Sequence, residues 1–312
     1  MRILLRYATA VVLRPHGRPL ASLLSAVLAS LAAVAARTAP APPQLPPLDA
    51  GTALLVLAPH PDDETLCCAG VIQRVLRAGG RASVVWLTSG DASLLDLLLI
   101  ERSVFGSAAK LRDLGVRRMR EARAATALLG VASSAQLFLG YPDRGLARLT
   151  AAPGDQPYAS PFTGVAAVPY SESPFAGHPY TAASLERDLA AILARVQPTL
   201  VLVPSPRDAH PDHAAAGLMA LRVLARRGGG VAVRCWIVHG GAGWPSPREL
   251  SAGVPLTRAP LLGDLPVAAF ALTPAEEDAK LAALRAYPTQ MLTLAPFLLS
   301  FVRTTEIFTA PP

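Results

Sequence analysis

Two short motifs rich in histidine and aspartate are the parts of this sequence best suited to chemistry. The first, HPDDE at residues 60–64, follows an apolar run and contains His60 and Asp63. The second, HPDH at residues 210–213, follows another apolar run of strand length. Imidazole and carboxylate groups three residues apart can converge on one metal ion, and both groups suit Zn²⁺. The sequence therefore indicates a metal site assembled from two distant segments.

The number of possible ligands fits a catalytic zinc site, which needs three protein ligands and one open position for water. His60, Asp63 and one histidine of the second motif supply that number. Asp62 is a candidate base for the water on the metal, whose pKa falls from ~15.7 toward ~7. Each motif alone could instead be a capped helix start with solvated side chains. Two such motifs, both at strand ends, favour the metal site.

Apolar runs of strand length alternate with helical patterns, which indicates an α/β fold. We expect strands at 53–57, 82–87, 136–139, 199–203, 232–238 and 268–272. We expect helices at 66–78, 117–129, 181–196, 214–226 and 273–287. The spacing of the first two strands predicts a parallel pair with a right-handed crossover. Both motifs then lie at the carboxyl edge of the sheet, where open α/β sheets build their sites.

Two long stretches show no regular period. Residues 92–118 are irregular in pattern and are expected to cover the site. Residues 153–179 are rich in proline, glycine, serine and aromatic residues. A loop of this length in a compact domain is usually a lid, a binding loop or a disordered insert.

The cysteines give no sign of a disulfide framework. Cys67 and Cys68 are adjacent, and Cys235 lies in an apolar strand pattern. Neighbouring cysteines rarely bridge each other, and no CxxC metal motif is present. We therefore expect Cys67 and Cys68 to pack as small apolar residues.

The formal net charge of +7 arises mostly from the beginning of the chain. Residues 1–37 contain five of the 29 basic residues and none of the 22 acidic ones, which leaves the remainder at +2. No basic stripe is interleaved with aromatic residues, as a nucleic-acid surface would require. We therefore expect no nucleic-acid partner.

The same beginning of the chain has the pattern of a targeting segment. Residues 1–37 combine arginines with an apolar run at 20–36, and they are expected to be a signal sequence or membrane anchor. The run spans roughly 26 Å as a helix, which is marginal for a bilayer. A Pro-rich linker at 38–50 and a catalytic domain at 51–312 would follow. The protein is thus expected to be exported or membrane-anchored; the alternative is a cytoplasmic extension.

The two motifs resemble those of the PIG-L/LmbE-like zinc-dependent N-deacetylases. The family's A-H-P-D-D-E corresponds to residues 58–64, with Pro59 before the histidine, and its H-P-D-H corresponds to residues 210–213. Further matches are Arg120-Glu121, Ala125, Leu129-Gly130, Leu139 to Asp143, Lys280, Ala283 to Tyr287 and Gln290. The resemblance covers about residues 52–292 and implies a Rossmann-like, mostly parallel sheet with helices on both faces.

The resemblance also implies the metal site and the reacting groups. It implies His60, Asp63 and His213 as ligands of Zn²⁺, although another divalent cation could take the place of zinc. It implies Asp62 as the general base. His210 would stabilise the oxyanion or protonate the leaving amine.

Four further residues are candidates at the same site. The resemblance implies that Asp212 orients His210, and that Arg120 and Asp143 hold sugar hydroxyls. His239 ends the strand expected at 232–238, so its side chain is a candidate at the same sheet edge. We assign Arg120, Asp143 and His239 to substrate binding.

The implied function is a zinc-dependent hydrolase that removes an N-acetyl group from an N-acetylglucosamine-type sugar conjugate, with metal-bound water as nucleophile. One alternative is a hydrolase of the same fold that cleaves another amide, such as an acylated antibiotic or a thiol precursor. Another is a non-catalytic carbohydrate-binding protein of the envelope. The expected partner is a small-molecule or glycoconjugate substrate, with membrane association possible through the N-terminus. The sequence does not indicate an oligomeric state.

Overall fold

A computed structural model describes residues 42–101, 107–151 and 156–312. These residues belong to one compact unit that begins at Pro42. The expected signal or anchor at 1–37, and the first part of the linker, lie outside the described residues. Within the described part, no helix is both long enough and apolar enough to cross a membrane.

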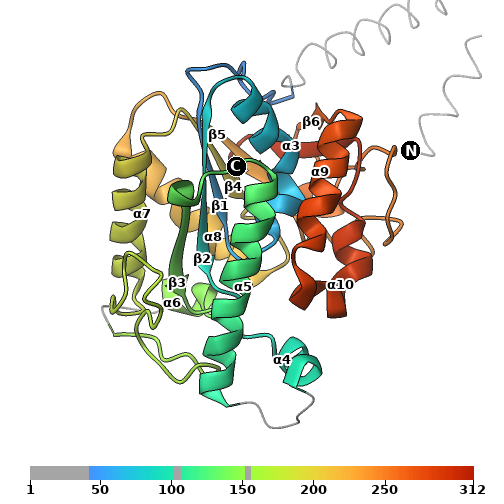
Figure 1. Cartoon of the computed structure of the whole chain (residues 1–312). Helices are drawn as coiled ribbons and strands as arrows, with labels where there is room; N and C mark the ends of the chain where they lie inside the picture. The colour runs from blue at the N-terminus through green and yellow to red at the C-terminus, as the bar shows by residue number, and fades with distance from the viewer. Residues whose placement is uncertain (1–41, 102–106, 152–155) are drawn as a thin grey trace, which may run out of the picture. The chain divides into compact units, whose positions relative to one another are not determined.

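The core of the protein is a seven-stranded sheet with the order β3-β2-β1-β4-β5-β7-β6 (Figure 1). The strands are β1 (Ala53–Ala58), β2 (Arg81–Thr88), β3 (Gln136–Tyr141), β4 (Leu200–Pro204), β5 (Ala232–Trp236), β6 (Val267–Ala271) and β7 (Thr305–Thr309). The first five strands pair in parallel, whereas β7 is antiparallel to both β5 and β6. The expected α/β fold with a mostly parallel sheet is confirmed.

Helices cover both faces of this sheet. They are α3 (Asp63–Arg77), α4 (Leu94–Glu101), α5 (Ala108–Leu128), α6 (Leu146–Ala151), α7 (Ala182–Val196), α8 (Pro211–Arg227), α9 (Pro274–Arg285) and α10 (Pro288–Leu299). Two 3₁₀ turns, η1 (Ser133–Ala135) and η2 (Pro260–Leu262), complete the elements. Side chains alternate along β1: Leu54 and Val56 pack on the α3 side, and Leu55 and Leu57 on the α7 and α8 side.

The strand order places the two chemical motifs beside each other. β1 pairs with β2 on one side and with β4 on the other, so the sheet changes its direction of growth between β1 and β4. The first motif follows β1 and the second follows β4. Ligands of open α/β sheets bind at such a switch point, outside the carboxyl ends of the strands.

The stretch at 92–118 is more regular than its sequence pattern indicates. It contains α4 and the first half of α5, and the Ser107 side chain caps α5 by accepting from the backbone N–H of Lys110. The expectation of irregular structure is therefore wrong for the described residues. Tertiary burial stabilises the first turns of α5, because Leu111 and Leu114 pack with Leu97 of α4.

The long segment before α7 packs against β3. Residues 156–181 form no helix or strand beyond one bridge between Ala167 and Pro179. The Tyr180 hydroxyl donates to the Gly140 carbonyl at 3.0 Å, and the Ser173 hydroxyl donates to the Leu139 carbonyl at 2.8 Å. This part of the segment is thus packed on the sheet, and residues 152–155 lie outside the described residues.

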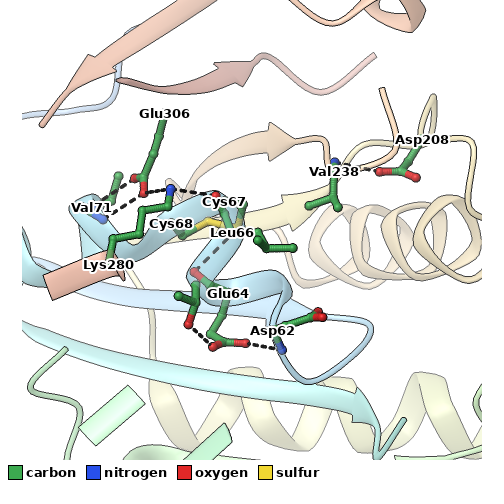
Figure 2. Close-up of a disulfide and its surroundings, with 12 residues drawn as sticks. Asp62, Glu64, Leu66, Cys67, Cys68, Val71, Asp208, Val238, Lys280 and Glu306 are labelled. Carbon is green, nitrogen blue, oxygen red and sulfur yellow. Dashed lines mark hydrogen bonds and ion pairs between the residues drawn. A yellow bond between two sulfur atoms is a disulfide. The ribbon is translucent and has the colours of Figure 1, made fainter. Parts of the chain in front are cut away.

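The adjacent cysteines of α3 form a disulfide (Figure 2). Cys67 and Cys68 are bonded to each other, and both side chains are buried. The expectation that they stay unbridged is therefore wrong. Both cysteines lie on the part of α3 that the core encloses, and their sulfur atoms are bonded there. Cys235 of β5 is buried and unbridged.

Candidate metal and active site

The turn after β1 holds its backbone in an unusual conformation. Asp62 has φ +119°, a value that non-glycine residues rarely adopt. The Asp62 N–H donates to Glu64 Oε2 at 3.2 Å, and the Gln290 side-chain amide donates to the Pro61 carbonyl at 2.6 Å. Strained backbone of this kind costs about 1–3 kcal/mol and persists where the surroundings hold it.

Glu64 connects this turn to the core (Figure 2). Its carboxylate is fully buried and accepts hydrogen bonds from Trp86 Nε1 at 2.8 Å, from Thr65 Oγ1 and from the Tyr287 hydroxyl. Burial raises the pKa of Glu64, and these three donors act against that rise. Glu64 therefore supports the backbone of Asp62 and is already fully engaged by protein groups.

Three donor atoms from the two motifs converge on one point. His60 Nδ1 lies 3.1 Å from His213 Nε2, and Asp63 Oδ2 lies 3.4 Å from the first atom and 3.2 Å from the second. A tetrahedral ion with bonds of about 2.0–2.1 Å separates its ligands by about 3.3 Å. The residues present therefore fit a small divalent cation such as zinc.

The outer ring nitrogens of both histidines face carboxylates. His60 Nε2 lies 3.3 Å from Asp143 Oδ1 and 3.4 Å from Asp212 Oδ2. His213 Nδ1 lies 3.1 Å from Asp208 Oδ2. Metal-binding histidines commonly donate their second N–H to a carboxylate, which fixes the ring and the tautomer. This arrangement independently supports a metal at the inner nitrogens.

Asp208 is a functional residue that the sequence pattern did not reveal. It is 5% exposed, and its Oδ2 also accepts from the backbone N–H groups of Val238 and His239, both at 3.0 Å. Its Oδ1 accepts from the His210 N–H at 2.8 Å. Burial opposes ionisation, but His213 lowers the pKa of Asp208 to about 2. Its position two residues before His210 was the available signal.

The two adjacent aspartates of the first motif have opposite electrostatic environments. Burial and the neighbouring carboxylates of Asp63 and Glu64 raise the pKa of Asp62 well above its usual value. Burial acts on Asp63 as well, but His213 and His60 prevail and lower the pKa of Asp63. Asp62 is thus the more basic of the two carboxylates, and Asp63 remains an anionic ligand.

His60 and His213, whose inner ring nitrogens lie close together, both have raised pKa values. Burial disfavours the charged form of His213, but Asp63 and Asp208 raise its pKa to about 9. Burial likewise opposes the charge on His60, whose pKa is raised by Asp143, Asp212 and Asp63. A cation would find the same negative surroundings favourable, and its binding would displace these protons.

His210 has the opposite character. Burial and the nearby His60 and His213 lower the pKa of His210 to about 3, so its ring is neutral at physiological pH. Its Nδ1 accepts from the Asp212 N–H at 3.2 Å as the cap of α8. The ring proton therefore resides on Nε2, which is left as a hydrogen-bond donor.

These groups surround a cavity of about 230 Å³ at the carboxyl edge of the sheet. Ligand pockets commonly measure ~300–1,000 Å³, so this one suits a single sugar unit rather than a whole conjugate. The polar residues that line it are His60, Asp62, Asp63, Ser93, Arg118, Asp143, Arg144, His210, His239 and Gln290. Gln290 is buried, and its Oε1 has no hydrogen-bond partner among the described residues.

The structure brings Arg118, and not Arg120, to this cavity. Arg120 is exposed and does not line the cavity, so its assignment to substrate binding needs correction. Successive residues of a helix are ~100° apart, which turns Arg120 about 200° away from Arg118. Arg118 is buried, donates to the Gly90 carbonyl at 2.7 Å and pairs with Asp96.

Two carboxylates contact groups other than those expected. Asp212 does not contact the His210 ring through its carboxylate; that carboxylate faces His60 and accepts from the backbone N–H groups of Arg144 and Leu146, at 2.6 and 3.0 Å. Asp143 lines the cavity but is engaged by His60 and by the N–H of Ala92 at 2.9 Å. Both therefore orient His60, because the turns after β3 and β4 lie at the same carboxyl edge of the sheet.

His239 does reach the cavity. Its ring stacks on Phe297 with centroids 5.6 Å apart, and its centroid lies 5.1 Å from that of His210. Burial and His213 lower its pKa to about 4, so His239 is neutral. Trp244 does not line the cavity and is buried against Phe301.

The fold and site define an α/β protein with a three-donor candidate metal site beside a carboxylate to which no described group donates a hydrogen bond. The sequence model of the PIG-L family, described as GlcNAc-PI de-N-acetylase, matches residues 55–224. The match covers more than half of the chain, and the chain belongs to this family.

The chain is also similar to one curated relative, of which it spans less than two thirds, and in fold to two solved structures. A 1D-myo-inositol 2-acetamido-2-deoxy-alpha-D-glucopyranoside deacetylase of Nakamurella multipartita is 30% identical over 224 residues, which cover 67% of this chain and 62% of the relative. The N,N'-diacetylchitobiose deacetylase of Pyrococcus horikoshii has a TM-score of 0.52 at 19% identity, covering 83% of each chain. The A40926 pseudoaglycone deacetylase has a TM-score of 0.54 at 19% identity, covering 83% of this chain and 97% of that one.

Proposed function

We propose that this protein is a zinc-dependent N-deacetylase that hydrolyses the acetamide of an N-acetylglucosamine-type conjugate. The observation that carries the proposal is the convergence of three donor atoms, 3.1–3.4 Å apart, beside the free carboxylate of Asp62. Family membership and the deacetylase names of the relatives support it. The cavity size supports a single acetylated sugar as the group that enters.

His60, Asp63 and His213 would hold the metal. A divalent cation bound there would supply Lewis acidity, which makes water more acidic and polarises a carbonyl. The outer carboxylates keep the two imidazole rings turned inward. Asp208 fixes His213, while Asp143 and Asp212 fix His60.

Asp62 would accept the proton of the attacking water. Among the described residues, no group donates a hydrogen bond to its carboxylate. Its raised pKa makes this carboxylate a stronger base than an ordinary aspartate. The proton would then pass to the departing nitrogen as the amide C–N bond breaks, giving acetate and a free amine.

His210 would stabilise the charge that develops on the acetamide oxygen. Its ring is neutral and holds its proton on Nε2, so it acts as a hydrogen-bond donor rather than an acid. Removal of one such donor typically costs ~10²–10³-fold in rate.

We further propose that residues 1–37 direct the protein to a membrane or out of the cytoplasm. The arginines and the apolar run at 20–36 support this. Fractionation of cells that express the full chain tests it: a full-length protein found only in the soluble cytosolic fraction would contradict the proposal.

The enzymatic proposal is tested with purified protein and defined substrates. Metal content is measured before and after chelation, and acetate release is followed with N-acetylglucosaminyl-inositol, diacetylchitobiose and simple N-acetylglucosaminides. We expect turnover that disappears with chelation and returns with Zn²⁺ or another divalent cation, and Asp63→Ala should lose the metal. Release only from acylated antibiotics or thiol precursors would shift the substrate class, and metal binding without any turnover would contradict the proposal.

A further inference from the structure

Asp91 is a buried carboxylic acid that the proposed reaction does not use. It lies in the turn after β2, is fully buried and does not line the cavity. The Tyr170 hydroxyl donates a hydrogen bond to Asp91 Oδ2, and the Ser89 hydroxyl donates to the same oxygen at 3.4 Å. Asp91 Oδ1 has no hydrogen-bond partner among the described residues. A buried polar atom without a partner costs free energy, so its presence calls for an explanation.

Two contacts connect the turn of Asp91 to His60, a ligand in the proposed metal site. The backbone N–H of Ala92 donates to Asp143 Oδ2 at 2.9 Å. The other oxygen of Asp143, Oδ1, lies 3.3 Å from the outer ring nitrogen of His60, Nε2. The position of residues 91 and 92 therefore determines where Asp143 holds the His60 ring.

Tyr170 connects the same turn to the long segment at 156–181. Its side chain is buried, and it approaches Asp91 beside α5. Gly115 of α5 leaves the room for this contact, because a Cβ atom at this position would lie 2.6 Å from the Tyr170 hydroxyl oxygen and 3.1 Å from Asp91 Cβ. No residue of 156–181 lines the cavity, so any effect of this segment on the site passes through contacts such as this one.

The surroundings of Asp91 make its charge state sensitive to pH. Burial and the nearby carboxylate of Asp143 raise the pKa of Asp91 to about 7, and the Tyr170 hydroxyl acts against this rise. Burial and Asp91 raise the pKa values of Tyr170 and Tyr180, so both phenols stay neutral. Arg118 of α5 donates to the carbonyl of the preceding residue, Gly90. The titratable or charged groups around Asp91 are thus Asp143, Tyr170, Tyr180 and Arg118.

We propose that Asp91 is a positioning residue that couples residues 156–181 to the metal site, because its bond with Tyr170 fixes the turn that holds Asp143 against His60. This inference rests on the proposed function, within which it adds a determinant of metal affinity. The long segment then acts on the metal without touching it. The carboxyl group also has an effect that an amide would lack, since its ionised form adds negative charge behind Asp143 and favours a bound cation.

The test measures zinc affinity by competition with a zinc indicator at pH 6. Asp91→Ala and Tyr170→Phe should each weaken zinc binding about five- to tenfold, somewhat less than the ~10- to 100-fold typical of a direct partner of a metal ligand. Asp91→Asn keeps an oxygen that accepts from Tyr170 and should bind zinc nearly as tightly as the wild type. Equal losses in Asp91→Asn and Asp91→Ala would contradict the positioning role.

The pH dependence separates the carboxyl group from the amide. From pH 6 to pH 8 Asp91 ionises in the wild-type protein but not in Asp91→Asn. The zinc affinity of the wild type relative to Asp91→Asn should therefore rise about threefold over this range. A constant ratio would show that the charge of Asp91 does not reach the metal site, and it would overturn the proposal even if Tyr170→Phe failed to fold.

Tyr180→Phe provides a matched control within the same segment. Tyr180 is also buried, but its hydroxyl donates to the Gly140 carbonyl at 3.0 Å and not to Asp91. Tyr180→Phe and Tyr170→Phe should both lower the stability measured by urea denaturation, whereas only Tyr170→Phe should weaken zinc binding. Equal zinc affinities in these two variants would assign Tyr170 a purely structural role and overturn the proposal.

Zinc binding without substrate distinguishes this proposal from the proposed function. Zinc affinity that responds to Asp91 and Tyr170 in a protein that releases no acetate would support the positioning role, although the hydrolase assignment would fail. Acetate release together with the same zinc affinity in every variant would overturn the positioning role alone. A wild-type protein that binds no zinc would overturn both.

Discussion

The two strand-to-helix turns of the site contribute similar residues, but these residues differ in backbone conformation and in hydrogen-bond partners. The turn after β1 carries Asp62 on a backbone with positive φ, and no described group pairs with its carboxylate. The turn after β4 has ordinary backbone angles, and Asp208 within it is bound by one imidazole and three backbone N–H groups. The first turn leaves a carboxylate free to react, whereas the Asp208 carboxylate of the second turn is fully paired.

This difference indicates that the two turns contribute differently to turnover and to metal binding. The strained first turn needs support from elsewhere, which it receives from Glu64 and from Gln290 of α10. The second turn has ordinary backbone angles, and two N–H groups that follow β5 complete the bonding of Asp208, which in turn positions His213. We therefore expect substitution of the free carboxylate of Asp62 in the first turn to affect turnover, and substitution of the paired carboxylate of Asp208 in the second to affect metal affinity.

Asp62→Asn should produce the largest effect. The amide cannot accept a proton, so kcat should fall by about 10²- to 10⁴-fold, the usual contribution of a general base. Zinc affinity should change little, because Asp62 is not among the three converging donors. Steady-state kinetics and competition with a zinc indicator measure the two quantities.

The neighbouring Asp63→Asn provides the matched control. It should lose metal affinity together with activity, because it removes an anionic donor. Full activity of Asp62→Asn would show that the first turn does not supply the base, and the contrast between the two turns would fail.

The second largest effect concerns the pH dependence of the chelated protein. The folded-state pKa of His213 is raised to about 9, so its stabilisation is complete below about pH 6.5 and is lost as the pH rises through 9. The free energy of unfolding should fall by about 3 kcal/mol across this window. Urea denaturation between pH 6 and 9.5 measures it.

Metal should abolish this dependence. A coordinated histidine is already deprotonated, so protein saturated with zinc should show a flat profile over the same range. A chelated protein whose stability does not change between pH 6.5 and 9 would show that Asp63 and Asp208 do not hold a proton on His213.

Much of the site could be predicted because it depends on local pattern. Apolar runs followed by His60 and by His210 identify β1 and β4, and parallel pairing carries both motifs to one edge. The capping residue Thr273 and its partner Glu276 likewise predict the start of α9, where the structure shows a capping box. These features need no knowledge of distant contacts.

The remainder depends on tertiary contacts that a pattern does not reveal. Asp208 resembles any turn aspartate until the backbone that follows β5 supplies its donors. The choice between Arg118 and Arg120 depends on the phase of α5, which Gly90 and Asp96 fix. The strand β7 was not expected because it is defined by its antiparallel neighbours β5 and β6.

Asp208→Asn should have an intermediate effect, and this effect should be a loss of metal affinity. Four donors converge on the two oxygens of Asp208, and an amide keeps only one of these oxygens. The His213 ring should lose its fixed orientation, and zinc affinity should fall by about 10- to 100-fold. Saturating zinc should restore most of kcat. A loss of kcat that excess zinc does not restore would place Asp208 with the reacting groups and remove the contrast between the turns.

Glu64→Gln should have the smallest effect, and this effect should be a decrease in kcat alone. The amide oxygen can still accept from the Asp62 N–H and Trp86, while the hydroxyls of Thr65 and Tyr287 can reverse to accept from the new NH₂. The acceptor loses its charge, which weakens the hydrogen bond to the Asp62 backbone and predicts a fall in kcat of about threefold with unchanged zinc affinity. A fall as large as that of Asp62→Asn would mean that Glu64 itself exchanges the proton. An unchanged kcat would mean that the Glu64 contact does not hold the first turn in its reactive conformation.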